Sequence, residues 1–365
     1  MIRVALAGAG KMGLSHLAML GAHPDVKVVA VTDPAKHLVG VLGQLSGFKA
    51  YTDYAALLAN EELDAVVIAT PSRFHGEMVR AALERGLHVF CEKPFCLDIE
   101  EGERLADLAA FKGLVNHVGY HYRHVGAFQE CKRIVDLGLL GSLHNIRAEA
   151  YGPVVLRPQG GTWRSSSTEG GGCLYDYASH ALDLMNFLVG PPEDVRGTIL
   201  NKIFSRDVDD EVYSNFIYAN GLNGQLMANW SDESFRKMSM KIGLWGEKGR
   251  IQADRQELQV YLRDEPADAS LGYVKGWNIK YTTELTEETW FYLRGEEYSA
   301  QISTFVDEIK AGKAGGVSTF RTALETDVTI NRMKSDSLQS GHLPQRIVFE
   351  APKRGILQSI LGSRR

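Results

Sequence analysis

Apolar and polar positions follow a repeating order over the first 120 residues. Short apolar runs of strand character are each followed by a stretch whose apolar residues recur at helical spacing. The runs are IRVALA, KVVAVTD, LDAVVIAT, LHVFCE and LVNHVGY, and the helical stretches include YAALLANEE, HGEMVRAALERG and IEEGERLADLAAFKG. Strands that alternate with helices are typical of βαβ units. We therefore expect a Rossmann-like doubly wound parallel sheet (fold class α/β) in a first domain, residues 1–123.

The pattern changes after residue 124. A helical stretch, AFQECKRIVDLG, leads into segments with partial period-two alternation, namely SLHNIRAEAY, VRGTILNKIF, EVYSNFIYAN, QLMANWS, MSMKIGLWG, GRIQAD and ELQVYLR. Such alternation favours antiparallel strands. Two later stretches, EEYSAQISTFVDEIKAGK and TALETDVTINRMKS, predict helices, the first ending near Gly312. We expect an α+β domain over 124–345, built on a large, mostly antiparallel open sheet with helices on one face, and a tail over 346–365.

The segment NGLNG, residues 220–224, predicts a tight hairpin turn between two of these strands. Asn220-Gly221 and Asn223-Gly224 are both dipeptides that suit such a turn. The alternation of the flanking strands does not decide between them.

Composition narrows the class of protein. The chain has 365 residues, 44% of them hydrophobic, and a net charge of −5, which suits about two globular domains and argues against nucleic acid or an anionic membrane as a partner. No charged-then-apolar leader precedes IRVALA, and no apolar run reaches membrane-spanning length. The four cysteines, at positions 91, 96, 131 and 173, lack a metal or redox spacing. We expect a cytoplasmic protein with reduced thiols.

The motif GAGKMG, residues 8–13, follows the first strand and opens a helical stretch. In this setting Gly8 permits a tight turn, Gly10 lets a pyrophosphate approach the backbone, and Gly13 allows close helix packing. The helix N-terminus attracts the phosphates, beside Lys11 and Met12. The motif predicts a dinucleotide-binding site.

Asp33 stands at the end of the second strand, 20 residues after the motif. A carboxylate there can accept hydrogen bonds from the adenosine ribose and repels a 2′-phosphate, which favours NAD over NADP. Lys36 and His37 follow closely in the sequence and could bind a 2′-phosphate, so NADP remains an alternative cofactor.

Two further motifs follow predicted parallel strands. TPSRFH, residues 70–75, comes after DAVVIA, and EKP, residues 92–94, comes after LHVFC. Open α/β sheets form their ligand crevice at the carboxyl ends of such strands. Thr70 and Pro71 could instead simply form a turn, and Glu92 and Lys93 could form a solvent-exposed ion pair.

The stretch GGGCLYDYASHALDLMNFL, residues 170–188, places three ionisable groups in an apolar helix. At 100° per residue, Asp176, His180 and Asp183 share one face. Because an unpartnered buried charge is costly, the three must be paired, ligate a metal or face a cleft.

Taken together, these motifs and their order resemble the glucose-fructose oxidoreductase, inositol dehydrogenase and rhizopine-catabolism (Gfo/Idh/MocA) family. The resemblance runs from GAGKMG through TPSRFH, CEKP and GYHYRHVGAF to TWRSSSTEGGGCLYDYASHALDL. It implies catalytic roles for Lys93, Asp176 and His180. It implies a place on the cofactor side for Gly8, Gly10, Gly13, Asp33, Thr70, Pro71, His75 and Glu92, together with Lys93. Two positions depart from the family pattern, where Ala178 replaces a glycine and Gly126 replaces a proline.

The resemblance implies an NAD(P)-dependent oxidoreductase that acts on a secondary alcohol or ketone of a sugar, sugar derivative or cyclic polyol. His180 has the pKa range of a proton acceptor, and Lys93 can donate to the alcohol oxygen; either could move the proton. Asp176 can orient the imidazole or bind a substrate hydroxyl. The expected substrate contacts are Arg123, Trp163, Arg164 and Asp183, the last in a supporting role.

Several alternatives remain open at this stage. An NAD-dependent glycoside hydrolase with transient oxidation, or a non-catalytic dinucleotide or sugar sensor, would carry similar motifs. His117, His121 and His124 form a cluster in the sequence, yet no further ligand accompanies them, and we expect no metal. An open sheet would expose an apolar face, so we expect a homodimer or homotetramer through the C-terminal sheet.

Overall fold

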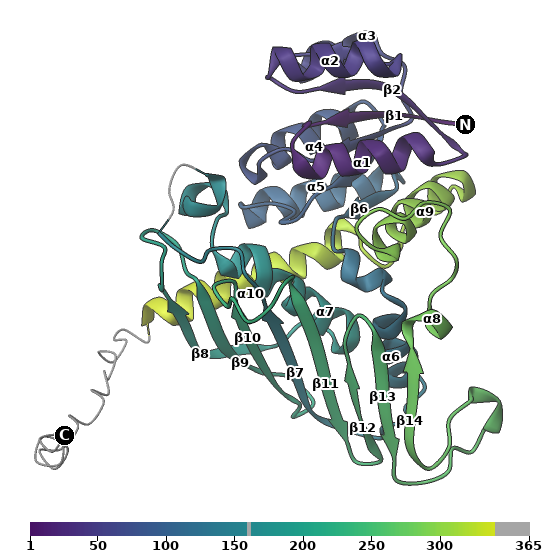
Figure 1. Cartoon of the computed structure of the whole chain (residues 1–365), viewed down its shortest axis with the longest axis vertical. Helices are drawn as coiled ribbons and strands as arrows, with labels where there is room; N and C mark the ends of the chain where they lie inside the picture. The colour runs from purple at the N-terminus through teal and green to yellow at the C-terminus, as the bar shows by residue number, and fades with distance from the viewer. Residues whose placement is uncertain (159–161, 340–365) are drawn as a thin grey trace, which may run out of the picture.

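The computed structural model describes residues 1–158 and 162–339 and shows two sheet-based domains arranged along the long axis of the molecule (Figure 1). The predicted tail, 346–365, and the last residues of the predicted second domain lie outside the described residues. Within those described, no helix is long and apolar enough to cross a membrane.

The first domain confirms the predicted parallel sheet. Its six strands lie in the order β3-β2-β1-β4-β5-β6, and every neighbouring pair is parallel. The strands are β1 (Ile2–Ala7), β2 (Val26–Thr32), β3 (Lys49–Tyr51), β4 (Ala65–Ile68), β5 (His88–Cys91) and β6 (Asn116–Val118). The helices are α1 (Lys11–Ala22), α2 (Lys36–Ser46), α3 (Tyr54–Asn60), α4 (His75–Glu84) and α5 (Ile99–Phe111). The strand order reverses between β1 and β4, which places a ligand crevice at their carboxyl ends.

The second domain is built on the expected large open sheet. Its eight strands lie in the order β14-β13-β12-β11-β7-β10-β9-β8, and only β10 and β7 pair in parallel. The strands are β7 (Leu143–Tyr151), β8 (Asp194–Asn201), β9 (Glu211–Ile217), β10 (Asn223–Asn229), β11 (Ser239–Gly246), β12 (Gly249–Ala253), β13 (Glu257–Leu262) and β14 (Gly276–Tyr281). Figure 1 shows α6 (Gly126–Asp136), α7 (Ser179–Val189) and α10 (Phe320–Gln339) behind this sheet. The helices cover one face, as predicted.

The hairpin between β9 and β10 settles which dipeptide forms the turn. The Gly221 N–H donates to the Tyr218 carbonyl oxygen at 3.0 Å, and Gly221 has a φ of 80°. Asn223 and Gly224 already pair with Ile217 and Phe216 in the ladder. Asn220-Gly221 therefore makes the turn, because its glycine takes the left-handed backbone that the turn requires.

The chain returns to the first domain near its end. Helix α9 (Glu296–Ala311) places Ile302, Phe305 and Val306 in one apolar cluster with residues of β1. The helix ends before Gly312, whose φ of 62° fits the predicted end. The start of α10 also packs on the first domain, since the Phe320 ring stacks on Phe95 with ring centres 4.2 Å apart. The predicted boundary at residue 123 therefore does not assign α9 and the start of α10, which follow the second-domain strands in sequence but pack on the first domain.

Helix α6 begins at Gly126, where the resemblance leads one to expect proline. A Cβ atom at Gly126 would lie 2.4 Å from the Leu285 carbonyl oxygen. That oxygen belongs to α8 (Thr282–Leu285), which packs on the start of α6. Glycine permits this close approach of two backbones.

Candidate functional site

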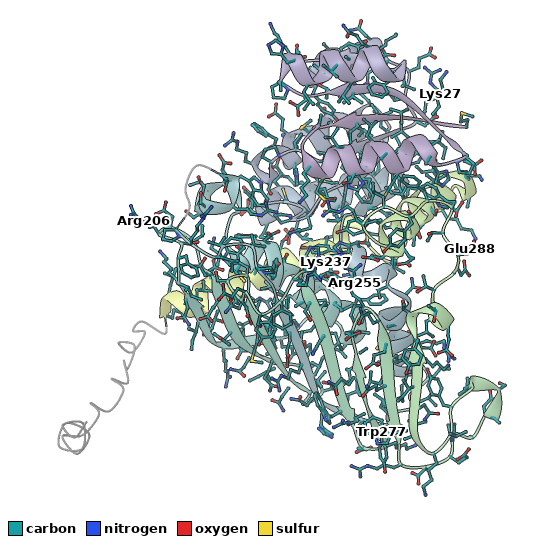
Figure 2. All side chains as sticks on the ribbon, viewed as in Figure 1. Lys27, Arg206, Lys237, Arg255, Trp277 and Glu288 are labelled. Carbon is teal, nitrogen blue, oxygen red and sulfur yellow. The ribbon has the colours of Figure 1, made fainter. Side chains whose placement is uncertain are left out.

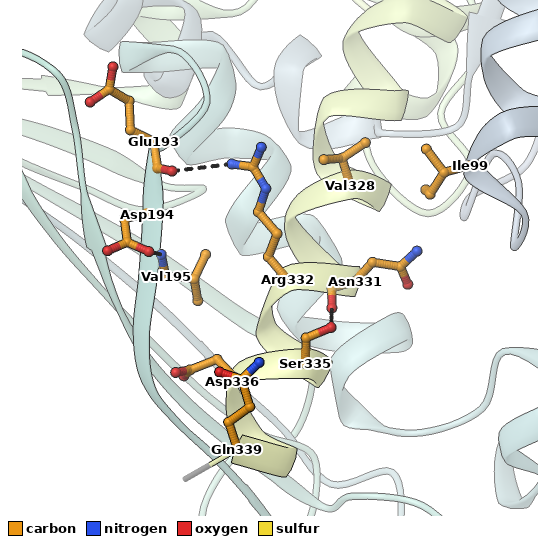
Figure 3. Close-up of a pocket in the computed structure, with 10 residues that line it drawn as sticks. All are labelled: Ile99, Glu193, Asp194, Val195, Val328, Asn331, Arg332, Ser335, Asp336 and Gln339. Carbon is orange, nitrogen blue, oxygen red and sulfur yellow. Dashed lines mark hydrogen bonds between the residues drawn. The ribbon is translucent and has the colours of Figure 1, made fainter.

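A cavity of about 1190 Å³ lies between the domains and is lined by residues of both. Most of the site residues predicted from the sequence line it, namely Gly8, Gly10, Lys11, Met12, Asp33, Thr70, Pro71, Glu92, Lys93, Trp163, Arg164, Asp176 and His180. A second cavity, of about 430 Å³, lies between α10 and β8 (Figure 3). Arg332 there donates to the carbonyl oxygens of Pro192 and Glu193, and none of the predicted site residues lines it.

The three glycines of GAGKMG have different physical roles. Gly8 has a φ of 92°, and a Cβ there would lie 2.6 Å from the Ala69 carbonyl oxygen. A Cβ at Gly13 would lie 1.8 Å from the Gly8 carbonyl oxygen, so Gly13 packs behind the turn and does not line the cavity. No atom lies within 4 Å of the Cβ position of Gly10. Gly8 and Gly13 thus permit the tight turn, and Gly10 leaves space beside it for a ligand.

The N-terminus of α1 fits the phosphates of a dinucleotide. Its N-cap residue, Gly10, provides no capping side chain, and the first turn contains no acidic residue. The first N–H groups of a helix lack partners within the helix and carry a partial positive charge, which suits an anion. Asp33 lines the cavity beside this turn, and its carboxylate accepts hydrogen bonds from the N–H groups of Ala9 at 2.8 Å and Ala35 at 2.9 Å.

Lys93 and Asp176 form an ion pair inside the cavity although they come from different domains. The Lys93 Nζ donates to Asp176 Oδ1 at 2.8 Å, and the Arg164 Nε donates to Asp176 Oδ2 at 3.0 Å. Burial alone would raise the pKa of Asp176, but the two cations outweigh it and lower that pKa to about 2. The Arg164 guanidinium also lies over the Trp163 ring, 4.8 Å from its centre. Asp176 is therefore a permanent anion that holds Lys93 in place.

His180 lines the same cavity as a neutral imidazole. Burial, and then the charge of Lys93, hold the pKa of His180 well below its usual value of 6.5. Its ring lies edge-on to those of His121 at 4.8 Å, Tyr122 at 5.3 Å and Tyr120 at 5.8 Å. Its Nδ1 atom is buried and has no hydrogen-bond partner among the described residues. A neutral imidazole in this position can accept a proton.

The helix that carries these groups is not regular. Residues Leu174–Ala178 form a π-helical turn, and α7 begins only at Ser179. A π-turn hydrogen-bonds from i to i+5, so it widens the helix and breaks the regular rotation of 100° per residue. The π-turn changes the rotation between Asp176 and His180, and both still line the cavity. His180 and Asp183 are one turn apart on the regular helix α7, yet Asp183 does not line the cavity.

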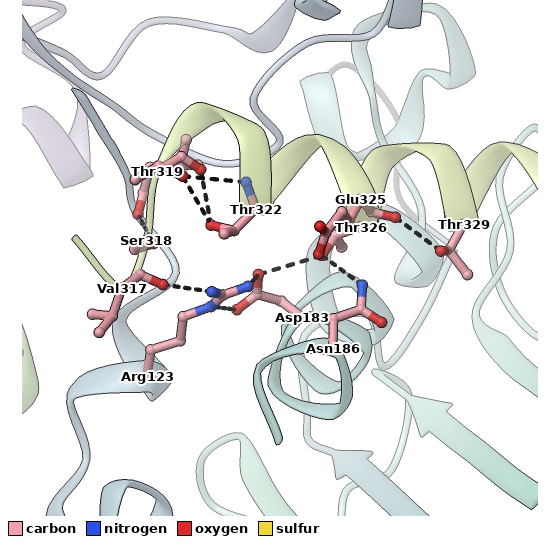
Figure 4. Close-up of polar contacts among 11 residues, drawn as sticks. Arg123, Asp183, Asn186, Val317, Ser318, Thr319, Thr322, Glu325, Thr326 and Thr329 are labelled. Carbon is pink, nitrogen blue, oxygen red and sulfur yellow. Dashed lines mark hydrogen bonds and ion pairs between the residues drawn. The ribbon is translucent and has the colours of Figure 1, made fainter. Parts of the chain in front are cut away.

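Asp183 instead pairs with Arg123 in the protein interior (Figure 4). The Arg123 Nε donates to Asp183 Oδ2 at 2.8 Å and its Nη2 to Oδ1 at 2.6 Å, while the Thr326 hydroxyl adds a contact of 3.3 Å. The Arg123 Nη1 also donates to the Val317 carbonyl oxygen. Both charged side chains are almost wholly buried, and neither lines the large cavity. The expectation that Arg123 and Asp183 contact substrate is corrected, since their polar atoms bind each other, Val317 and Thr326 in the protein interior.

His75 is likewise placed behind the cavity wall. Its Nδ1 lies 2.8 Å from the Pro94 carbonyl oxygen and its Nε2 lies 2.9 Å from that of Thr70. Burial lowers the pKa of His75 despite these two carbonyl contacts. The side chain joins the loops that follow β4 and β5, so it positions them from behind, which corrects the expected direct place beside the cofactor.

Sequence reasoning missed several residues that line the cavity. His121 stacks on Tyr298, with ring centres 4.3 Å apart. Arg255 and Arg294 line it beside them. Tyr298 belongs to α9, and Arg294 precedes that helix, so both reach the site only because the chain returns to the first domain. No local motif marks them.

The three histidines at positions 117, 121 and 124 do not form one cluster. His117 lies in β6 and its Nε2 is 3.0 Å from Glu308 Oε2, whereas His121 lines the cavity. Among the described residues, no group of three or more His, Cys, Asp or Glu side chains is arranged to hold a metal ion.

Comparison with known proteins gives the family. The family model described as "Oxidoreductase family, NAD-binding Rossmann fold" matches residues 2–120, and the "GFO/IDH/MocA C-terminal domain" matches residues 128–252. The chain is 28% identical to levoglucosan dehydrogenase of Pseudarthrobacter phenanthrenivorans over 77% of this chain and 80% of the relative. It is 26% identical to myo-inositol 2-dehydrogenase of Thermotoga maritima over 87% of this chain and 91% of the relative.

A solved structure supports the fold independently. A levoglucosan dehydrogenase in complex with NADH and levoglucosan superposes with a TM-score of 0.80 at 24% identity, over 93% of this chain and 97% of that one. The chain therefore belongs to the Gfo/Idh/MocA family of oxidoreductases, and its first domain is an NAD-binding Rossmann fold.

Proposed function

We propose that the protein is a dehydrogenase or reductase that transfers a hydride between NAD and a secondary alcohol or ketone of a sugar, sugar derivative or cyclic polyol. One observation carries the proposal: a single cavity contains both the glycine turn for the dinucleotide and the Lys93, Asp176 and His180 side chains. The names of the relatives, a levoglucosan dehydrogenase and an inositol dehydrogenase, support the substrate class.

The side chains divide the proton chemistry between them. NAD, when bound, supplies the hydride acceptor. His180 accepts the hydroxyl proton, since its imidazole is neutral and lines the same cavity as Lys93 and Asp176. The Lys93 ammonium, held by Asp176 at 2.8 Å, donates a hydrogen bond to the alcohol oxygen as negative charge develops there. Lys93 is already paired as a cation, which is why we assign the proton transfer to His180.

The test measures NADH formation with a panel of sugars and polyols. We expect His180→Asn to lower kcat by about 10²–10⁴-fold while NAD still binds, and Lys93→Met to lower kcat as well. Lys27→Met, at an exposed position on β2, is the control. Full turnover in both site variants would refute the assigned roles. Release of an aglycone without net NADH would indicate glycoside hydrolysis instead.

We propose that NAD is preferred over NADP. Asp33 lines the cavity, whereas Lys36 and His37 do not. A 2′-phosphate would meet the Asp33 carboxylate, and like charges repel. A dissociation constant for NADP equal to or below that for NAD would refute this preference.

We further propose that the protein forms a homodimer or homotetramer through the open face of the second sheet. Trp277, Ile279 and Tyr281 of β14 are each about half exposed there, and Tyr261 of β13 packs against Trp277 at 5.3 Å. An exposed apolar row of this kind is typical of an interface. Ile279→Lys should shift the sedimentation profile toward the monomer, while Val274→Lys, in the loop before β14, should not. A monomeric wild-type protein at micromolar concentration would refute the proposal.

We also propose a cytoplasmic location. All four cysteines are free and buried, and unpaired thiols suit a reducing compartment. Cell fractionation that recovers the protein outside the cytosol would refute this.

A further inference from the structure

The large cavity is rich in positive charge. We propose that the alcohol substrate carries an anionic substituent, a carboxylate or a phosphate, and that Arg236, Lys237 and Arg294 bind it. This inference rests on the proposed function and narrows its substrate class.

The charges that line the cavity are strongly unequal. Eight lysine and arginine residues line it, against three carboxylates, Asp33, Glu92 and Asp176. The whole chain has a net charge of −5, so the excess of cations is local and opposite in sign to the rest of the protein. A cleft lined by one sign of charge concentrates ligands of the other sign.

Several of these cations already have partners. Lys93 and Arg164 pair with Asp176, Arg73 pairs with Glu169, and Arg255 pairs with Glu297. Lys11 opens helix α1, where the phosphates of the dinucleotide are expected.

Three of the cations that line the cavity are left without a carboxylate partner in the part of the chain that the structure describes. Among the described residues, no ion pair joins Arg236, Lys237 or Arg294 to a carboxylate, and none of the three belongs to the glycine turn. No carboxylate of the described residues neutralises their charge, and the Arg294 side chain hydrogen-bonds to that of Tyr298.

These cations approach the reacting groups from two sides. Arg294 lies close enough to His121 to contribute to its lowered pKa, after burial, His180, Arg255 and Lys93, and the His121 ring is 4.8 Å from that of His180. Arg236 and Lys237 belong to the segment between β10 and β11, and Figure 2 labels Lys237 and Arg255 where the two domains meet.

The segment that carries Arg236 and Lys237 also reaches the Asp176 side of the cavity. A Cβ at Gly152 would lie 2.4 Å from the Tyr177 hydroxyl and 3.1 Å from the Met238 Cα, so only this glycine separates the two segments. An anionic group between these walls would leave the rest of the substrate beside Lys93 and His180.

The backbone at Arg294 points to the same use. Among the described residues, Arg294 is the only one other than glycine with a positive φ, at 72°. A residue other than glycine in this left-handed region is strained, and such residues cluster at active sites, ligand clamps and switch regions. The Arg294 guanidinium lies 5.4 Å from the centre of the Tyr298 ring, which itself lines the cavity. The strained backbone directs a cation along the cavity wall.

The experiment compares each neutral alcohol with its anionic counterpart. The pairs are glucose with glucuronate, glucose with glucose 6-phosphate, and myo-inositol with myo-inositol 1-phosphate, so the carboxylate and phosphate arms are measured separately. At low salt we expect kcat/KM, measured by NADH formation, to be at least about tenfold higher for an anionic member. Added salt should reduce this advantage and leave the neutral sugars unaffected.

A matched pair of variants assigns the effect to the cavity. Arg236→Gln/Lys237→Gln should raise KM for the anionic substrate by about tenfold, with little change in kcat or in KM for the neutral one. Lys27→Gln/Arg206→Gln removes the same charge from exposed positions remote from the cavity (Figure 2) and should change neither. Equal effects of the two double variants would overturn the inference.

Failure of this inference can be told apart from failure of the proposed function. Turnover of neutral sugars that equals or exceeds that of their anionic counterparts overturns the anionic substrate and leaves the dehydrogenase proposal intact. Binding of NAD without NADH formation from any member of the panel overturns both.

Discussion

Replacing Asp183 by asparagine separates a structural role from a substrate-binding one. The Asp183 carboxylate is 1% exposed and accepts two hydrogen bonds, at 2.8 and 2.6 Å, from a guanidinium that is 3% exposed. Asparagine keeps the shape but removes the charge and one acceptor, so the Arg123 cation stays buried without a counterion. We expect Asp183→Asn to destabilise the fold and to leave kcat/KM per folded molecule nearly unchanged.

The geometry sets the size of the effect. Removing one partner of a buried ion pair costs about 3–5 kcal/mol. The asparagine carbonyl can still accept one of the two hydrogen bonds, so the cost should fall near the lower end, about 3 kcal/mol. Arg123→Met should cost a similar amount. The double variant Arg123→Met/Asp183→Leu should cost less than the sum of the single variants, because no unpaired charge remains.

Urea unfolding followed by tryptophan fluorescence measures the stability, and NADH formation measures kcat and KM on the same samples. Glu100→Gln is the control, because Glu100 pairs with Arg104 at 3.7 Å on an exposed helix face and such pairs contribute little. If Asp183→Asn keeps the wild-type urea midpoint but raises KM, Asp183 contacts substrate and the structural role assigned to it is wrong.

Three further predictions concern single positions. Gly13→Ala should abolish NAD binding, because its Cβ would lie 1.8 Å from the Gly8 carbonyl oxygen; Gly21→Ala on the same helix meets no atom within 4 Å and should leave calorimetric NAD binding unchanged. The acid limb of the pH profile of kcat/KM should lie below pH 6.5, because the pKa of His180 is depressed well below that value and only the neutral ring accepts a proton; an acid limb at or above 6.5 would contradict this. Burial raises the pKa of Asp327 well above 3.8, so the native state holds a proton that the unfolded chain releases, and stability should fall as pH rises from about 4 through the folded pKa. Asp327→Asn should flatten that dependence in urea midpoints measured across pH, and a variant with the wild-type slope would count against it.

Local sequence was sufficient where a short segment determines its own structure. The alternation of strands and helices predicted the parallel sheet, because each βαβ unit has an apolar strand and an amphipathic helix within about 30 residues. GAGKMG predicted the glycine turn for the same reason, since the constraint acts within six residues. The two candidate turns in NGLNG could not be separated, because the choice depends on the register of β10 against β9.

Contacts between distant residues were beyond such reasoning. Arg123 and Asp183 are 60 positions apart, and a helical wheel shows which residues share a face but not which partner from another segment meets them. The strand β14, Gly276–Tyr281, does alternate in the sequence, and its period of two was the signal that could have revealed it. Arg294 and Tyr298 carried no such signal.

The return of the chain explains why Lys93 and His180 can share one cavity. Lys93 follows β5 of the first domain, and His180 lies on α7 of the second. Helix α10 starts against the first domain, where the Phe320 ring stacks on Phe95 at 4.2 Å, and the Cys96 N–H, three residues after Lys93, donates to Asp327 of α10 at 3.2 Å. The same helix supplies Thr326 to the ion pair of Asp183. Because α10 contacts both the Lys93 loop and α7, the distance between the two catalytic side chains depends on this helix, and substitutions in it should alter kcat without touching the substrate.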